Sequence, residues 1–218
     1  MTGRLPAGVL WDMDGTLVDS EKVWDTALSG LAAHLGGELS QQARLDMVGT
    51  NMAVSIGVLF DDLGLPPTQQ AQAEALVWLA ARAAALYAEP LPWRPGAAEA
   101  LAMVRAAGIP CALVTNTERA ITELGLESLG RHNFEAIVCG DEVPAPKPAP
   151  YPYRRAAELL GADPADCLAV EDSPTGVAAA RAAGCPVLVV PCVLPVPPGE
   201  GRRLRDTLIG LRLDELRI

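Results

Sequence analysis

Two aspartates separated by one residue, Asp12 and Asp14, follow an apolar stretch near the start of the chain and precede Gly15 and Thr16. Side chains alternate faces along a strand, but where a strand ends and the chain turns at a glycine, both carboxylates can point into one pocket. Crowded carboxylates repel each other unless a cation neutralises them or one of them holds a proton. Because hard oxygen ligands suit Mg²⁺, the pair predicts a centre for metal-assisted or acid–base chemistry.

Two other interpretations of this Asp-x-Asp-Gly run remain open on the residues alone. An aspartate before a glycine often forms a turn and caps the helix that follows. The run also resembles half of a calcium-binding loop, but that loop needs a third oxygen ligand before the glycine and a glutamate at its end. The third ligand is absent here, so the choice lies between a turn and a site with partner residues elsewhere.

Polar side chains that suit phosphate or metal binding recur at three later points of the chain. A hydroxyl and an amide follow one apolar run, a lysine lies between two prolines, and adjacent carboxylates follow another apolar run. In chain order these are Thr115 and Asn116 after residues 111–114, Lys147, and Glu171, Asp172 and Ser173 after residues 167–170. The partner residues that the turn interpretation lacks are therefore present.

Short apolar runs alternate with helix-like segments from residue 96 onward. The pattern predicts strands at 110–115, 136–139, 167–171 and 186–190, and helices at 96–107, 118–126, 152–160 and 174–183. Short, wholly apolar strands separated by helices indicate a Rossmann-like α/β core, a parallel sheet with helices on both faces. Ligands bind such sheets beyond the carboxyl ends of the strands, where the polar residues lie.

Residues 19–91 interrupt this alternation and contain no clear strand. Helical periodicity at 23–35, 54–63 and 68–87 predicts an inserted all-helical domain, with residues 1–18 and 92–218 forming the core. The alternative is a helical layer within a single domain, because helices after a strand are common. The connections between the two parts are expected near 18–20 and 89–92.

The four motifs, in this order, resemble those of the haloacid dehalogenase-like hydrolase superfamily, in its branch of phosphatases and β-phosphoglucomutase-like enzymes. The resemblance covers nearly the whole chain, and only the residues from about 191 onward add little to it. It implies that Asp12 is the nucleophile that forms an aspartyl-phosphate and that Asp14 is the general acid and base. It also implies that residues 19–91 form a helical cap that closes over the site and selects the substrate.

The resemblance further implies a magnesium site and a phosphate site. Mg²⁺ would be bound by the carboxylates of Asp12 and Asp172 and the backbone carbonyl of Asp14. Phosphate would be bound by Thr115, Lys147 and the backbone N–H groups of Met13, Asp14 and Asn116. Because metal ligands need orienting partners, Glu171 is expected to orient them, the alternative being a solvated acid. Ser173 is expected to cap the next helix and to donate to the ligands.

The chain departs from the family pattern in two places. Many relatives have a helix-capping acid shortly after the lysine motif, where this chain has Tyr151, so the loop near Lys147 is expected to differ from theirs. The loop 48–52 lacks the arginine that resembles the distal phosphate clamp of the mutases, so Thr50 and Asn51 could bind a neutral hydroxylated group. This loop, and Thr16 where mutases often carry valine, favour a phosphatase acting on a sugar phosphate, phosphoglycolate or a nucleotide. A phosphomutase and a catalytically silent metal- or phosphate-binding regulator are the alternatives.

The composition is that of a globular, acidic protein. The chain has 218 residues, half of them hydrophobic, and a formal charge of −10 from 17 basic and 27 acidic residues, which disfavours nucleic-acid binding. Its five cysteines include no Cys-x-x-Cys motif and are expected to be buried thiols in a reducing compartment. With neither a signal peptide nor a membrane-spanning run expected, we predict a cytoplasmic enzyme, monomeric or weakly dimeric, that acts on a small phosphorylated metabolite and binds neither nucleic acid nor membrane.

Overall fold

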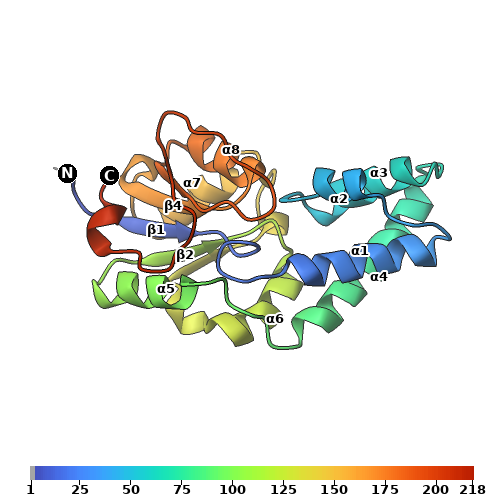
Figure 1. The fold of residues 1–218 in the computed structure, drawn as a ribbon, viewed down its shortest axis with the longest axis horizontal. Helices are drawn as coiled ribbons and strands as arrows, with labels where there is room; N and C mark the ends of the chain where they lie inside the picture. Colours follow the sequence, from blue (N-terminus) through green and yellow to red (C-terminus); the bar gives the residue numbers. More distant parts are fainter. Residues whose placement is uncertain (1–2) are drawn as a thin grey trace.

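The computed structural model describes residues 3–218, and its centre is a six-stranded sheet in which every neighbouring pair of strands is parallel (Figure 1). The strand order is β3–β2–β1–β4–β5–β6. The strands are β1 (Gly8–Trp11), β2 (Cys111–Val114), β3 (Ala136–Val138), β4 (Cys167–Glu171), β5 (Val187–Val189) and β6 (Arg202–Leu204). After β1, the strands β2 and β3 follow on one side of it, and β4, β5 and β6 then follow on the other side. The direction in which successive strands are added therefore reverses between β1 and β4. The Rossmann-like α/β prediction is confirmed.

Helices cover both faces of the sheet, which is why β1, β2 and β4 are buried along their whole length. On β1, Val9 and Trp11 belong to a cluster that includes residues of α5 and α6, whereas Leu10 belongs to a second cluster that includes residues of α7 and α8. These helices are α5 (Ala97–Ala106), α6 (Arg119–Leu129), α7 (Tyr151–Leu159) and α8 (Pro174–Ala183). The packing leaves the carboxyl edge of the sheet open to form a site.

The segment between β1 and α5 forms four helices that pack on one another beside the sheet (Figure 1). They are α1 (Glu21–His34), α2 (Gln41–Asp46), α3 (Met52–Asp62) and α4 (Gln69–Tyr87). Side-chain oxygens of Ser40, Asn51 and Thr68 accept backbone N–H bonds at the starts of α2, α3 and α4. The helical prediction for 19–91 missed only α2, whose six residues, largely polar, carry no periodic signal.

The two connections between these helices and the sheet lie side by side. The backbone of Val18 forms an antiparallel bridge with Trp93. Asp19 N donates to Pro92 O (2.8 Å), and Arg94 N donates to Leu17 O (2.8 Å). The chain thus leaves the sheet and returns to it through one paired segment.

The predicted series of strands ended at residue 190, but the chain beyond it also adds to the core. The backbone of Arg202–Leu204 extends the sheet as β6, paired with β5. Leu208 and Leu216 are buried against the core, and Ile218 N donates to Arg4 O (2.9 Å), which joins the two ends of the chain (Figure 1). Charged side chains on an edge strand leave no apolar run, so the sequence gives no signal for β6. Within residues 3–218, no helix combines the length and the apolar character needed to cross a membrane.

Candidate active site

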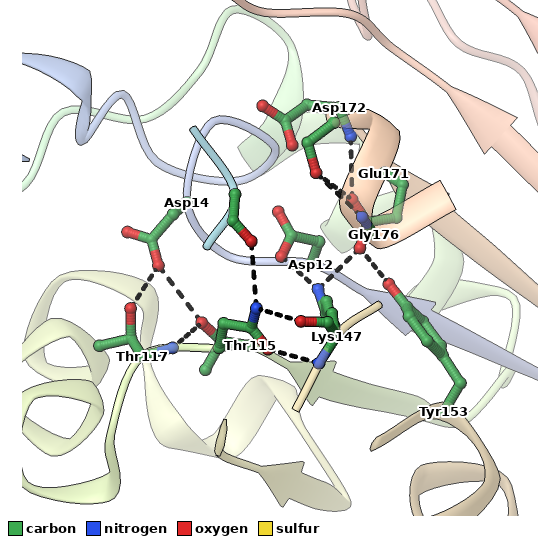
Figure 2. Close-up of polar contacts among 12 residues, drawn as sticks. Asp12, Asp14, Thr115, Thr117, Lys147, Tyr153, Glu171, Asp172 and Gly176 are labelled. Carbon is green, nitrogen blue, oxygen red and sulfur yellow. Dashed lines mark hydrogen bonds and ion pairs between the residues drawn. The ribbon is translucent and has the colours of Figure 1, made fainter. Parts of the chain in front are cut away.

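The predicted catalytic residues meet at the carboxyl edge of the three central strands (Figure 2). Asp12 follows β1, Thr115 follows β2, and Asp172 follows β4; these strands are neighbours in the sheet. Lys147 reaches the same point from the loop before α7. The reversal of strand order between β1 and β4 opens the edge at this position, as in other doubly wound sheets.

Lys147 is the buried cation that joins two of the acids. Its Nζ donates to Asp12 Oδ1 (2.6 Å) and to Glu171 Oε1 (2.7 Å), and only 3% of the side chain is exposed. The hydroxyl of Tyr153 also donates to Glu171, and the ammonium lies 5.2 Å from the centroid of its ring. Burial alone would lower the pKa of Lys147, but the two carboxylates outweigh it and raise the pKa, so the ammonium stays charged.

The acids of the site outnumber this cation. Burial raises the pKa of Asp12 to about 7; the charge of Glu171 adds to the effect, and Lys147 opposes it. Burial, followed by the charge of Asp12, raises the pKa of Asp172 well above its usual range. Three buried carboxylates facing one ammonium leave negative charge that a further cation would relieve.

The oxygens that remain fit a divalent cation. Ligand atoms of Asp12, Glu171 and Asp172 lie within 4.8 Å of one another. Glu171 is already bound by Lys147 and Tyr153, whereas Asp12 Oδ2 is buried without a hydrogen-bond partner among residues 3–218. Gly15 has φ +84°, and a Cβ there would overlap the Asp172 carboxylate, so the turn requires glycine. Buried carboxylate oxygens with one unpartnered atom are the donor set that Mg²⁺ prefers.

Asp14 is held by hydroxyl groups. Its Oδ1 accepts from Ser20 Oγ (2.7 Å) and from the Tyr87 hydroxyl, and its Oδ2 accepts from Thr117 Oγ1 (2.8 Å) and Thr115 Oγ1 (3.3 Å). Figure 2 shows the two threonines beneath the carboxylate. The sequence interpretation gave no role to Ser20, Tyr87 or Thr117. Only Thr117 carried a local signal, since it lies two residues beyond Thr115.

Tyr87 connects Asp14 to the helical segment, because it is the last residue of α4. Trp24 Nε1 of α1 donates to the Tyr87 hydroxyl (3.1 Å), which therefore accepts one bond and donates another. Burial and the neighbouring Asp14 raise the pKa of Tyr87 well above 10, so the hydroxyl keeps its proton and remains a donor.

Asn116 and Ser173 hold loops in place through their side chains. Asn116 Oδ1 accepts from Lys147 N (2.8 Å), and its Nδ2 donates to Lys147 O (3.1 Å) and Gly49 O (3.0 Å). Ser173 Oγ accepts from Gly176 N (3.1 Å) and caps α8. The Met13 side chain is buried in the core, so only its backbone is available for ligand binding.

The pocket in front of Asp12 extends to the helical segment. Thr50 lines it, whereas Asn51, expected beside Thr50 in binding, instead accepts from Val54 N (3.0 Å) and caps α3. Arg44 of α2 also lines the pocket. The sequence interpretation sought an arginine only in the loop 48–52 and missed this one, because α2 itself was not predicted.

Gly176 is a position where a methyl group should be harmful. A Cβ there would overlap the carboxylate of Glu171, the partner of Lys147 (Figure 2). Alanine forms helices better than glycine, yet we expect Gly176→Ala to lower the free energy of unfolding by about 2 kcal/mol through overpacking. Chemical denaturation monitored by circular dichroism measures the change.

Gly57 in α3 is the matched control for this substitution. Outside the backbone of its own helix, no described atom lies within 4 Å of the position that its Cβ would take. Gly57→Ala should therefore raise stability by about 0.5–1 kcal/mol. Equal effects of the two substitutions would contradict the steric role of Gly176.

The comparison with protein families agrees with this geometry. A model of the haloacid dehalogenase-like hydrolases matches residues 6–184. The chain belongs to the haloacid dehalogenase-like hydrolase family. As a member of this family, the protein is an enzyme of the phosphoric monoester hydrolase type, and the family prediction made from the four motifs is confirmed.

Relatives of this haloacid dehalogenase-like hydrolase carry several phosphatase names. Hexitol phosphatase B of Escherichia coli K12 is 32% identical over 196 residues, covering 87% of this chain and 86% of the relative. A phosphoglycolate phosphatase of Rhodospirillum rubrum is 35% identical over 192 residues, covering 85% and 80%. Among solved structures, CbbY of Rhodobacter sphaeroides in complex with xylulose-(1,5)-bisphosphate matches with a TM-score of 0.84 and 28% identity, covering 98% of this chain and 100% of that one.

Proposed function

We propose that this enzyme is a Mg²⁺-dependent phosphatase that hydrolyses a small phosphate monoester through an aspartyl-phosphate on Asp12. The observation that carries the proposal is the environment of Asp12. Its Oδ1 is fixed by Lys147, while its Oδ2 is buried and unpartnered among the described residues, beside Asp172. A carboxylate held in this way is oriented for attack on a phosphate that enters the pocket.

Lys147 supports both the free enzyme and the reaction. It holds Asp12 in one orientation, and its ammonium offsets the negative charge that an incoming phosphate brings next to the acids. Glu171, fixed in turn by the Tyr153 hydroxyl, keeps Lys147 in place. The backbone N–H groups at the turn after β1 and at Asn116 supply further donors for phosphate oxygens.

Asp14 would donate a proton to the leaving oxygen and then accept one from the attacking water. Its four hydroxyl partners hold the carboxylate in a single position. The carboxylates of Asp12 and Asp172 and the backbone carbonyl of Asp14 would hold Mg²⁺, which neutralises charge on the transferring phosphoryl group.

The helices of residues 19–91 would act as a cap. They touch the core at the pocket rim, where Asn116 bonds the carbonyl of Gly49 and a Cβ on Gly49 would lie 2.9 Å from Ser173 Oγ. Such closeness leaves little room for water and makes the cap residues part of the substrate site.

We place the enzyme in the cytoplasm, where its five free cysteines would stay reduced.

Tyr87→Phe tests the link between the cap and Asp14. The change removes one of the four hydroxyl partners of Asp14 and leaves the indole N–H of Trp24 without its acceptor. We expect kcat to fall about tenfold with little change in KM, because proton donation acts in the transition state rather than in binding. The loss should be larger for alkyl phosphates than for p-nitrophenyl phosphate, whose leaving group needs no proton.

Tyr151→Phe is the control for this loss of a hydroxyl, since Tyr151 is exposed at the start of α7 and does not line the pocket that contains Asp14. It should leave kcat unchanged. An equal loss with alkyl and aryl phosphates in Tyr87→Phe would mean that Tyr87 supports the fold alone and does not position Asp14.

Phosphate release from a panel of sugar phosphates, phosphoglycolate, nucleotides and p-nitrophenyl phosphate tests the proposal as a whole. Release should require Mg²⁺, stop with EDTA and return when Mg²⁺ is restored. If no ester is hydrolysed, interconversion of hexose phosphates would indicate a phosphomutase. Failure of both reactions would favour a silent phosphate-binding protein.

A further inference from the structure

The cap wall of the pocket carries an arginine whose charge is already matched. Arg44 Nη2 donates to Glu21 Oε2 (2.6 Å), and Arg44 Nε bonds the carboxylate of Asp25. The Arg44 and Glu21 side chains are 16% and 22% exposed, and both line the pocket. Asp25 does not line the pocket, and its side chain is 55% exposed.

This cluster leaves the cap side of the pocket without net positive charge. One guanidinium faces two carboxylates, so the three groups together carry one negative charge. The other cation of the pocket, Lys147, is engaged by Asp12 and Glu171. A second anionic group on a substrate would therefore meet a carboxylate and no unmatched cation.

The rest of the cap wall suits a chain of C–H and O–H groups. Trp24, Leu28 and Met47 present apolar surface to the pocket. Thr50 and Ser55 also line it, and their hydroxyl oxygens lie 2.9 Å apart. Hydroxyls can donate to and accept from a substrate hydroxyl, and the Glu21 carboxylate can accept from one. Apolar lining with a few polar groups orients a small neutral ligand.

We propose that the Arg44–Glu21–Asp25 cluster restricts this enzyme to phosphate monoesters with a neutral, polyhydroxylated organic part and excludes those with a second phosphate or a carboxylate. The inference rests on the proposed phosphatase function and narrows its substrate class. The family does not decide this point, because the names of relatives include hexitol phosphatase, phosphoglycolate phosphatase and a protein complexed with a bisphosphate. The selection operates by repulsion of the wrong substrate as well as by hydrogen bonds to the right one.

Steady-state kinetics on four substrates measure the selectivity. Sorbitol 6-phosphate represents the neutral class, phosphoglycolate and fructose 1,6-bisphosphate carry a second anion, and p-nitrophenyl phosphate is the reference. We expect kcat/KM for sorbitol 6-phosphate to be at least about tenfold higher than kcat/KM for either substrate with a second anionic group. Preference for phosphoglycolate or the bisphosphate would overturn the inference while leaving the phosphatase function intact.

Two charge-neutralising variants show whether the cluster causes the preference. Glu21→Gln keeps the size of the side chain and partly releases Arg44, so the ratio of bisphosphate to sorbitol 6-phosphate kcat/KM should rise about tenfold. Asp25→Asn, outside the pocket lining, should shift the ratio in the same direction but less, because Asp25 is more exposed. Glu74→Gln makes an equal change of charge at an exposed position of α4 and should leave the ratio unchanged. An unchanged ratio in Glu21→Gln would overturn the inference.

A binding measurement keeps this test separate from catalysis. Isothermal titration calorimetry of the Asp12→Asn protein with each substrate, in the presence of Mg²⁺, compares the Kd values of the substrates without turnover. Binding of sorbitol 6-phosphate at least about tenfold tighter than the bisphosphate supports the inference even if no ester is hydrolysed. Equal or reversed affinities reject it, whatever the outcome of the kinetic assays.

Discussion

Asp12→Asn is expected to abolish phosphate release, with kcat reduced at least about 10⁴-fold. Asparagine keeps the shape of the side chain but provides no carboxylate oxygen to attack phosphorus. Lys147 keeps its second partner, because its bond to Glu171 Oε1 (2.7 Å) does not involve Asp12. The loss should therefore reflect missing chemistry and not a rearranged site. Continuous assay of inorganic phosphate in Mg²⁺ measures it.

The stability of Asp12→Asn provides the internal control. Burial raises the pKa of Asp12 to about 7, above its unfolded value of 3.8, so the ionised side chain costs stability in the metal-free protein at pH 8. Replacing it with a neutral amide should leave the midpoint of metal-free thermal unfolding at pH 8 unchanged or higher. A variant that loses activity and also unfolds at a much lower temperature would not support a purely catalytic role for Asp12.

Asp14→Asn separates the nucleophile from the acid–base group. This variant keeps Asp12, so it should still accept a phosphoryl group from p-nitrophenyl phosphate but release it slowly. Intact-protein mass spectrometry after rapid quenching should detect the phosphorylated protein in Asp14→Asn and not in Asp12→Asn. More than about a hundredth of wild-type turnover in Asp12→Asn would exclude Asp12 as the nucleophile.

The parts of the site that were predictable from the sequence come from residues next to strand ends. Asp12, Thr115 and Asp172 each follow a buried apolar run, and parallel strands bring their carboxyl ends to one edge. The local pattern therefore fixes their location once the sheet is assumed. The same reasoning predicted the helices on both faces, because alternating apolar strands and helices have few other arrangements.

The residues that the sequence interpretation missed depend on tertiary packing. Tyr87 lies 73 residues from Asp14 along the chain, and only the packing of α4 against the core brings them together. Arg44 is on a six-residue helix with no periodic signal, and its pairing with Glu21 spans 23 residues. Neither contact follows from local propensity or motif spacing, since both require the path of the cap to be known.

Lys147→Met is expected to have the largest effect on stability as well as a severe effect on activity. The substitution removes the ammonium that lies 2.6 Å from Asp12 and 2.7 Å from Glu171 and leaves two buried carboxylates facing each other. Breaking a buried ion pair by removing one partner costs about 3–5 kcal/mol. Phosphate release should fall at least about 10³-fold, because Asp12 loses the contact that orients it and the bound phosphate loses its nearest cation. Urea denaturation and the phosphate assay measure the two effects.

Lys22→Met is the matched control, because the chain has only two lysines and Lys22 is exposed on α1. It should change neither stability nor activity measurably. Lys147→Met/Glu171→Gln tests the cause of the instability: removing one of the two unpaired carboxylates should recover part of the lost free energy of unfolding. No recovery would mean that packing, and not charge, accounts for the loss.

The pH dependence of the loss in Lys147→Met follows from the acids that remain. The pKa of Asp12 is about 7 in the intact site, although Lys147 lowers it, so removing Lys147 should raise it further. A carboxyl group whose folded pKa exceeds its unfolded value destabilises the fold above that unfolded value, and the penalty decreases as the pH falls below the folded pKa. Between the pKa of Asp12 in wild type and its higher pKa in Lys147→Met, only the variant holds the proton. The stability difference between the two proteins, measured without metal, should therefore shrink as the pH falls from 9 to 7. A difference that stays constant over this range would show that the buried carboxylates do not cause the loss.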